Sequence, residues 1–166
     1  MIQIRSFEES DIPVMLVAFG VYPWNKPASI FEHYWLEQQT NERCVWLAFL
    51  DEMFAGYITL KWHSAYQPFS TQQIPEIMDL NVLPLYRQRG IATQLLDLAE
   101  ITAMQRSARV GLGVGLYADY GNAQKLYFKR GYQPDGRGIT YDSQPVKPGE
   151  QVCLDDDLIF WLVKSL

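Results

Sequence analysis

Residues 79–93 read Asp79-Leu80-Asn81-Val82-Leu83-Pro84-Leu85-Tyr86-Arg87-Gln88-Arg89-Gly90-Ile91-Ala92-Thr93. This pattern predicts a strand, a short basic loop with a glycine, and the first turn of a helix. The first turn of a helix carries unpaired backbone N–H groups and a partial positive charge. Arg87 and Arg89 add cationic charge, and Gly90 lets the backbone approach a ligand closely. Ala92 has a small side chain that leaves room for a ligand, and Thr93 can donate a hydrogen bond from its hydroxyl. The segment therefore predicts a cradle for phosphate groups.

Two motifs make the chain resemble a known family. Arg87-x-x-Gly90-x-Ala92, after an Asp-Leu-x-Val strand, resembles the acyl-CoA signature of the GNAT superfamily of N-acetyltransferases. A second motif resembles the helix and exit turn that follow in this family: Ala123-Gln124-Lys125-Leu126-Tyr127-Phe128-Lys129-Arg130-Gly131-Tyr132. The two motifs stand in the order and at the separation that the family shows. The resemblance covers about residues 76–134.

The resemblance implies an α/β (α+β) fold, with one N-acetyltransferase domain over residues 1–166. The implied sheet is mixed and mostly antiparallel, with a central splayed pair of parallel strands and flanking helices. The hydrophobic pattern agrees, because a helix over 93–107 separates strands over 76–83 and 110–117. A strand–helix–strand order favours a parallel pair with a right-handed crossover.

The remaining elements are expected from hydrophobic periodicity and turn signals. Asp11 and Ser29 are expected to cap the first two helices, since both are favoured N-cap residues. Residues 64–74 are expected to form a polar, aromatic loop. Further helices are predicted over about 11–20, 29–40 and 122–129, and further strands over 2–5, 44–50, 54–62 and 157–164.

The resemblance implies that the cosubstrate is acetyl-CoA. Its pyrophosphate would accept hydrogen bonds from the backbone N–H groups of residues 88–93, while Arg87 orients the loop or touches phosphate. Its pantetheine arm would pair with exposed backbone groups of the strand over 76–83, a form of strand addition. Where the family often has a CoA-contacting Asn, this chain has Tyr120, and Asn122 follows two residues later. The expected cofactor-binding residues are Leu80, Val82, Leu83, Arg87, Gln88, Arg89, Gly90, Ile91, Ala92, Thr93, Asn122 and Tyr127.

Three side chains are candidates for proton transfer. An amine arrives mostly as ammonium near neutral pH and must lose a proton before it attacks a thioester. Asp79 and Glu76 are the candidate general bases, and Asp79 matches the carboxylate position that some family members use. Tyr127 is the candidate general acid, because a phenol with a pKa of about 10 can protonate a departing thiolate. The alternatives are solvated or ion-paired carboxylates and a core tyrosine.

Composition limits the classes of molecule that the protein is expected to bind. The 166 residues carry a formal net charge of −5, which disfavours non-specific nucleic-acid binding and suits a cationic amine, either a small molecule or a peptide. No apolar run approaches the roughly 20 residues that span a bilayer, so no membrane partner is expected. Cys44 and Cys153 give no disulfide framework, and residues 1–7 lack the apolar run of a signal peptide. A cytoplasmic location is therefore expected, and the oligomeric state stays open, with a homodimer as one option.

Several other sequence features have a structural explanation beside a functional one. Residues 111–115 lack the spacing of a dinucleotide-binding loop, and a strand that allows close approach of a ligand or backbone fits better. His33 and His63 lack metal-ligand spacing, so no metal is expected. The run 155–157 is either a solvated turn or a site for a cation. Aromatic residues in or beside loops could roof an acceptor cleft or pack in the interior: Trp24, Trp62, Tyr66, Phe69 and Tyr141.

The sequence thus predicts an acetyl-CoA-dependent N-acetyltransferase that works by direct attack in a ternary complex. Neither cysteine lies in a nucleophile motif, so a covalent acyl-enzyme is not expected. Two other classes remain open. The chain could bind acyl-CoA as a non-catalytic sensor, or it could be an interaction module that keeps only the fold.

Overall fold

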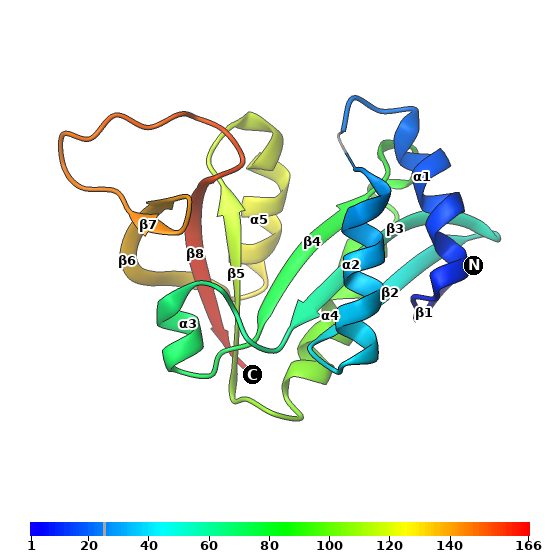
Figure 1. Ribbon diagram of the computed structural model, residues 1–166, viewed down its shortest axis with the longest axis horizontal. Helices are drawn as coiled ribbons and strands as arrows, with labels where there is room; N and C mark the ends of the chain where they lie inside the picture. The colour runs from blue at the N-terminus through cyan, green and yellow to red at the C-terminus, as the bar shows by residue number, and fades with distance from the viewer. Residues whose placement is uncertain (25) are drawn as a thin grey trace. The chain divides into compact units, whose positions relative to one another are not determined.

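The computed structural model describes residues 1–24 and 26–166 (Figure 1). Along the chain they form β1 (Ile2–Ser6), η1 (Glu9–Asp11), α1 (Ile12–Gly20), α2 (Ala28–Gln39), β2 (Arg43–Leu50), β3 (Met53–Lys61), α3 (Gln67–Thr71), β4 (Glu76–Val82), η2 (Pro84–Tyr86), α4 (Ile91–Ala103), β5 (Arg109–Gly115), η3 (Ala118–Tyr120), α5 (Gly121–Lys129), β6 (Gln133–Tyr141), β7 (Gln144–Pro145) and β8 (Leu158–Ser165). The strands follow the order β1-β2-β3-β4-β5-β8-β6-β7 in one sheet.

Strand direction confirms the predicted mixed sheet. Strands β4 and β5 pair in parallel, with Glu76 opposite Gly111 and Ile77 opposite Leu112. The pairs β1–β2, β2–β3, β5–β8, β6–β8 and β6–β7 are antiparallel. Helix α4 connects the two parallel strands, as the hydrophobic pattern indicated.

The chain divides into two compact units, which are described separately. The first unit comprises Met1–Trp62 and Met78–Thr102, and the second comprises His63–Ile77 and Ala103–Leu166. Strand β4 therefore contributes its first two residues to the second unit and the rest to the first. That residues 1–166 work as one domain stays a prediction.

Aromatic side chains dominate the core of the first unit. Phe7, Phe19, Phe31 and Tyr57 are all buried, and the Phe19 ring lies 6.1 Å from that of Phe31 and 5.8 Å from that of Tyr57. Full burial of each such ring contributes about 1.5–3 kcal/mol. Phe19, Phe31 and Tyr57 come from α1, α2 and β3, so their packing fixes both helices on the sheet.

The core of the second unit is smaller. Tyr66 stacks on Trp161 with ring centroids 4.0 Å apart, and Phe69 meets the same Trp161 edge-on at 5.4 Å. Ile74 packs with them. Helix α3 is thereby held against β8. This five-residue helix lies within residues 64–74, where a loop was expected, and it is too short to show a helical period in the sequence.

The glycine-rich strand β5 accommodates rings. A Cβ at Gly111 would lie 2.1 Å from the Phe69 ring, and one at Gly115 would lie 2.3 Å from the Tyr120 ring. At these two positions the close approach is made by aromatic side chains, where the sequence predicted a ligand or backbone.

Asp11 stands at the N-cap position of α1, as predicted, but its side chain makes no cap hydrogen bond to this helix. Its carboxylate instead accepts hydrogen bonds from Arg5 and from the Glu8 N–H and closes the η1 turn. Helix α2 begins at Ala28 after Pro27, and Ser29 lies inside its first turn. The Ser29 prediction was wrong because the preceding proline sets the start of that helix. In the described residues, no helix has the length and apolarity to cross a membrane.

Candidate active site

The predicted cradle lies in the first unit, where the chain leaves β4, passes through η2 and enters α4. The Gln94 N–H donates to the Gly90 carbonyl oxygen at 3.1 Å, which is the first helical bond of α4. The N–H groups of residues 91–93 precede that bond, so the helix does not use them. Ile91 is buried and holds the turn, whereas Gly90 and Thr93 are exposed. This geometry suits an anion at the start of α4.

The backbone of the cradle loop is unusual. Gln88 and Gly90 adopt φ values of +60° and +82°, a region that side chains disfavour. Arg87 holds the loop, since its Nε donates to the Val82 carbonyl oxygen at 3.0 Å. Its guanidinium also lies 5.7 Å from the centre of the Trp24 ring. These two contacts attach the Arg87 side chain to Val82 and to Trp24.

Asp79 lies at the centre of a polar cluster on β4, all of it in the first unit. It adopts φ +51° inside a strand, a strained conformation of the kind that clusters at functional sites. Its Oδ2 accepts hydrogen bonds from the hydroxyls of Tyr34 and Tyr57, the latter at 3.2 Å. The Lys26 ammonium lies 3.6 Å from Oδ1 and donates to the Tyr57 hydroxyl at 3.2 Å. The cluster thus brings a carboxylate, two phenols and an ammonium together.

The two phenols remain protonated. Burial, followed by the charge of Asp79, raises the pKa of Tyr34 and of Tyr57 well above the usual value for tyrosine. Both hydroxyls therefore donate to Asp79 at neutral pH. The Asp79 side chain keeps 30% of its surface exposed and that of Lys26 keeps 16%, so the cluster is open to solvent.

A buried ionic network supports this cluster. Arg43 stacks on the Tyr34 ring, with its guanidinium carbon 4.4 Å from the centre. The same side chain donates to Glu37 at 2.5 Å and to the Thr59 hydroxyl at 2.7 Å. Lys61 reaches Glu37 at 3.0 Å. Burial acts to raise the Glu37 pKa, but hydrogen bonds from Arg43 and Lys61 outweigh it and hold that pKa below 4.5.

The strand residues expected at the pantetheine arm also lie in the first unit. Leu80 and Val82 are half-buried. Leu83 is buried, and its N–H donates to the Ala55 carbonyl oxygen at 2.9 Å. The Leu83 N–H is thus already used inside the protein.

The other predicted site residues belong to the second unit. Glu76 is buried and accepts a hydrogen bond from the Ser64 hydroxyl. Tyr127 is buried on α5, and its ring lies 5.9 Å from that of Tyr132. Burial raises the Tyr127 pKa, so the phenol keeps its proton over the physiological range. Asn122 lies in the first turn of α5 and is exposed.

The acidic run before β8 is bound to tyrosines. Asp156 accepts hydrogen bonds from Tyr117 and from Tyr120, the latter at 2.7 Å. Asp155 accepts one from Tyr141 at 3.0 Å, and this bond is the main cause that raises the Tyr141 pKa to about 12. These carboxylates thus accept hydrogen bonds from tyrosines of η3, of β6 and of the segment before η3. Neither expected reading of the run, a solvated turn or a site for a cation, included this role.

Most of the loop aromatics pack inside the protein. Trp62, Tyr66 and Phe69 are buried. Trp24 is partly buried against the core of the first unit, and its ring stacks on Tyr22 at 4.9 Å.

Sequence reasoning missed the partners of Asp79. Lys26 stands in a loop without a motif, and Tyr34 and Tyr57 lie in patterns that read as amphipathic or buried. A tyrosine hydroxyl that reaches a distant carboxylate leaves no mark on periodicity. Only the tertiary fold brings these side chains to β4.

No group of three or more metal-ligating side chains occurs among residues 1–24 and 26–166. His33 instead lies 3.3 Å from Glu37, one helical turn away. Neither Cys44 nor Cys153 is in a disulfide bond, and Cys153 is exposed.

Comparison with known proteins identifies the family. A model of the acetyltransferase (GNAT) family matches residues 7–132. A GNAT-family acetyltransferase from Desulfovibrio desulfuricans is similar in structure, with a TM-score of 0.74, 12% identity and 99% of each chain covered. The PaiA N-acetyltransferase of Thermoplasma acidophilum, solved with coenzyme A, has a TM-score of 0.68 and 16% identity, covering 100% of this chain and 99% of its own.

The ribosomal-protein-S18-alanine N-acetyltransferase of Escherichia coli has a TM-score of 0.69 and 16% identity, covering 99% of this chain and 94% of its own. At these identities, the structural matches show a shared fold. A comparison with curated protein sequences found no match. The family model covers most of the chain, so this protein belongs to the GNAT acetyltransferase family.

Proposed function

We propose that this protein transfers the acetyl group of acetyl-CoA to a primary amine of a small molecule or peptide, by direct attack in a ternary complex. The observation that carries the proposal is the turn from Gln88 to Thr93, which presents unused backbone N–H groups beside two arginines. Such a turn fits a pyrophosphate. Related folds are solved with coenzyme A, which supports the same choice of cosubstrate.

Acetyl-CoA, when bound, supplies the acetyl group as a thioester. The N–H groups of residues 88–93 would bind its pyrophosphate, and Arg87 keeps their loop in place through its bond to Val82. Leu80 and Val82 would offer backbone groups to the pantetheine arm. The N–H groups of this strand would stabilise the oxyanion. Leu83 would contribute its side chain alone, because its N–H is bonded to Ala55.

Asp79 is proposed to receive the acceptor amine. The Lys26 ammonium beside it supports this role, because it demonstrates that a cationic nitrogen fits against Asp79 and Tyr57. The carboxylate would hold the ammonium and take its proton, directly or through water. Glu76 was the second candidate base; its burial and its bond to Ser64 favour a structural role.

Tyr127 is proposed as the acid that protonates the departing thiolate. Its raised pKa keeps the proton on the hydroxyl, so the phenol can donate that proton to the sulfur as negative charge develops there. Asn122 is proposed as a further CoA contact. The reducing cytoplasm is proposed as the location of the protein.

The test is acetyl-CoA-dependent release of thiol, measured across a panel of amines. Saturable release with at least one amine, lost in Asp79→Asn while CoA affinity stays unchanged, supports the proposal. CoA binding without release for any amine would favour the alternative, a non-catalytic acyl-CoA sensor. Absence of CoA binding would favour an interaction module.

A further inference from the structure

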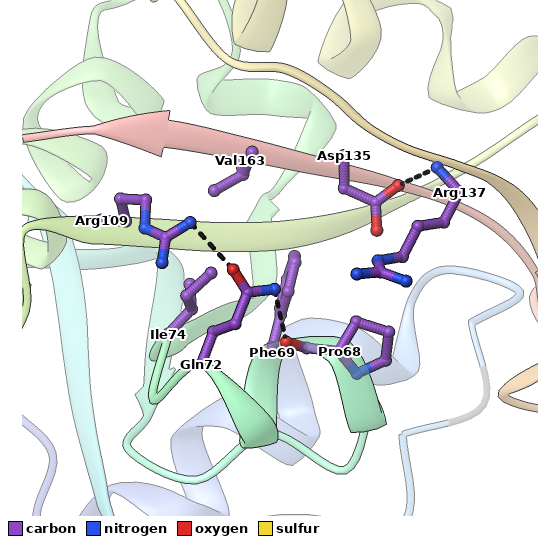
Figure 2. A pocket seen from close by; sticks show the side chains of 8 residues that line it. All are labelled: Pro68, Phe69, Gln72, Ile74, Arg109, Asp135, Arg137 and Val163. Carbon is purple, nitrogen blue, oxygen red and sulfur yellow. Dashed lines mark hydrogen bonds between the residues drawn. The ribbon is translucent and has the colours of Figure 1, made fainter.

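A cavity of about 140 Å³ lies in the second unit, lined from α3, the start of β5, β6 and β8 (Figure 2). None of the proposed catalytic or CoA-binding residues lines it. The proposed acetyl transfer therefore gives this cavity no role.

The chain builds a bulge that presents Arg137 to this cavity. The pairing of β6 with β8 shifts in register between Pro134 and Ile139. Gly136 and Gly138 flank Arg137 at φ +82° and +80°, where only glycine sits without strain. Bulges of this kind redirect a side chain. In Figure 2 the Arg137 guanidinium points into the cavity.

Asp135 fixes the bulge. Its Oδ1 accepts the Arg137 N–H at 2.9 Å and its Oδ2 accepts the Tyr66 hydroxyl at 2.7 Å. Tyr66 is in turn stacked on Trp161. Both carboxylate oxygens are therefore engaged by a core-anchored hydroxyl and a backbone N–H.

A second guanidinium faces the same cavity from the other side. Arg109 donates to the Gln72 side-chain oxygen at 3.0 Å, and Gln72 donates to the Pro68 carbonyl oxygen at 3.0 Å. Within residues 1–24 and 26–166, neither Arg109 nor Arg137 forms an ion pair. Two arginines against one engaged carboxylate leave an excess of positive charge.

The floor of the cavity holds three apolar side chains. Phe69 and Ile74 are 1% and 2% exposed, so each presents a small edge, and Val163 completes this part of the lining. A cavity of about 150 Å³ is large enough for benzene. Inorganic phosphate would leave this floor uncovered, and a nucleotide is far too large. A carboxylate forms paired hydrogen bonds with a guanidinium, so an apolar body of about six carbons ending in a carboxylate fits both parts.

We propose that this cavity, defined by Arg137, Arg109 and the Phe69–Ile74–Val163 floor, binds a small monocarboxylate with an apolar body. The carboxylate lies against Arg137, and Arg109 adds charge from the opposite wall. This site is independent of the proposed acetyl transfer.

Calorimetric titration with benzoate tests the proposal, with benzamide as the neutral isostere and inorganic phosphate as the anion without an apolar body. We expect saturable benzoate binding with a Kd of about 1 mM or tighter, and at least about tenfold weaker binding of the other two. Arg137→Gln should weaken benzoate binding about tenfold or more, and Arg109→Gln by less. Lys147→Gln, which removes the same charge from an exposed loop of this unit, should leave the Kd unchanged.

Thermal unfolding checks that each variant is folded. No saturable benzoate binding would overturn the proposal. If benzamide bound as tightly as benzoate, the site would not recognise the carboxylate. If inorganic phosphate bound as tightly as benzoate, the site would not recognise the apolar body. An unchanged Kd in folded Arg137→Gln would overturn the assignment to this cavity.

Discussion

Tyr127 is the residue whose environment bears most directly on its proposed chemistry. It is buried, and burial raises its pKa, so its hydroxyl stays protonated well above neutral pH. We therefore expect Tyr127→Phe to lower kcat about 10²-fold, the lower end of general acid catalysis, because a thiolate is already a tolerable leaving group. The KM for acetyl-CoA should change less. The loss should be uniform between about pH 6 and 9, since the phenol does not titrate there.

The matched control is Tyr132→Phe, which removes a hydroxyl from the neighbouring buried ring. That variant should keep its kcat. A Tyr127→Phe enzyme with wild-type kcat would make Tyr127 a packing residue and leave solvent as the proton donor.

Lys26 allows a second prediction at the same scale. It neutralises Asp79 in the structure, so an incoming ammonium must displace it. Lys26→Met should lower the KM of cationic amines several-fold and make it more sensitive to salt, because exposed charges are screened over about 8–10 Å. Neutral amines should change little. Steady-state kinetics at two salt concentrations measure this effect, and a raised KM for cationic amines would show that Lys26 helps to bind the acceptor.

Among the elements, the turn into α4 is the one on which cofactor binding depends. Gly90 has φ +82°, and a Cβ there would meet no protein atom within 4 Å. Gly90→Ala should therefore strain the loop and crowd the bound phosphate without disturbing the packing. We expect CoA affinity to fall tenfold or more, equivalent to about 1.4 kcal/mol, in calorimetry.

Gly149→Ala is the matched control, since Gly149 has φ +87° and equally open surroundings. It carries the same backbone strain in a loop remote in sequence from the cradle. If both variants bound CoA equally well, the loop over 88–93 would not be the phosphate site.

The elements also show what sequence could and could not predict. The parallel pair, the hairpin of β2 and β3, and the turn into α4 were predicted because period, turn residues and motif agree locally. Helix α3 was not predicted, because the packing of Phe69 is tertiary, and the expected Asp11 cap bond is absent because Arg5 binds that carboxylate. The cluster around Asp79 was missed because Lys26, Tyr34 and Tyr57 come from a loop, a helix and a strand that only the fold brings together.

The stability of the whole molecule should depend on the ionic network around Glu37. Its folded pKa lies below its ordinary value of 4.5, so the stabilisation is complete above that pH. It is lost as pH falls through the lowered folded pKa. The free energy of unfolding should therefore decrease with acid below about pH 4.5.

Denaturant unfolding of the wild type and Glu37→Gln over this pH range measures the effect. The variant should be less stable by about 3–5 kcal/mol near neutral pH, because Arg43 would keep a buried charge without its carboxylate. Its stability should also depend less on pH. Parallel pH curves for the two proteins would contradict the assignment to Glu37.

The central claim, acetyl transfer to an amine, is tested most directly by the mass of the product. The protein is incubated with acetyl-CoA that carries a deuterated acetyl group and with the best amine from the thiol-release panel. We expect the amine to gain one deuterated acetyl group, with one thiol released per product, and Asp79→Asn to abolish both. Thiol release without labelled amine would indicate hydrolysis of the thioester and would contradict the account.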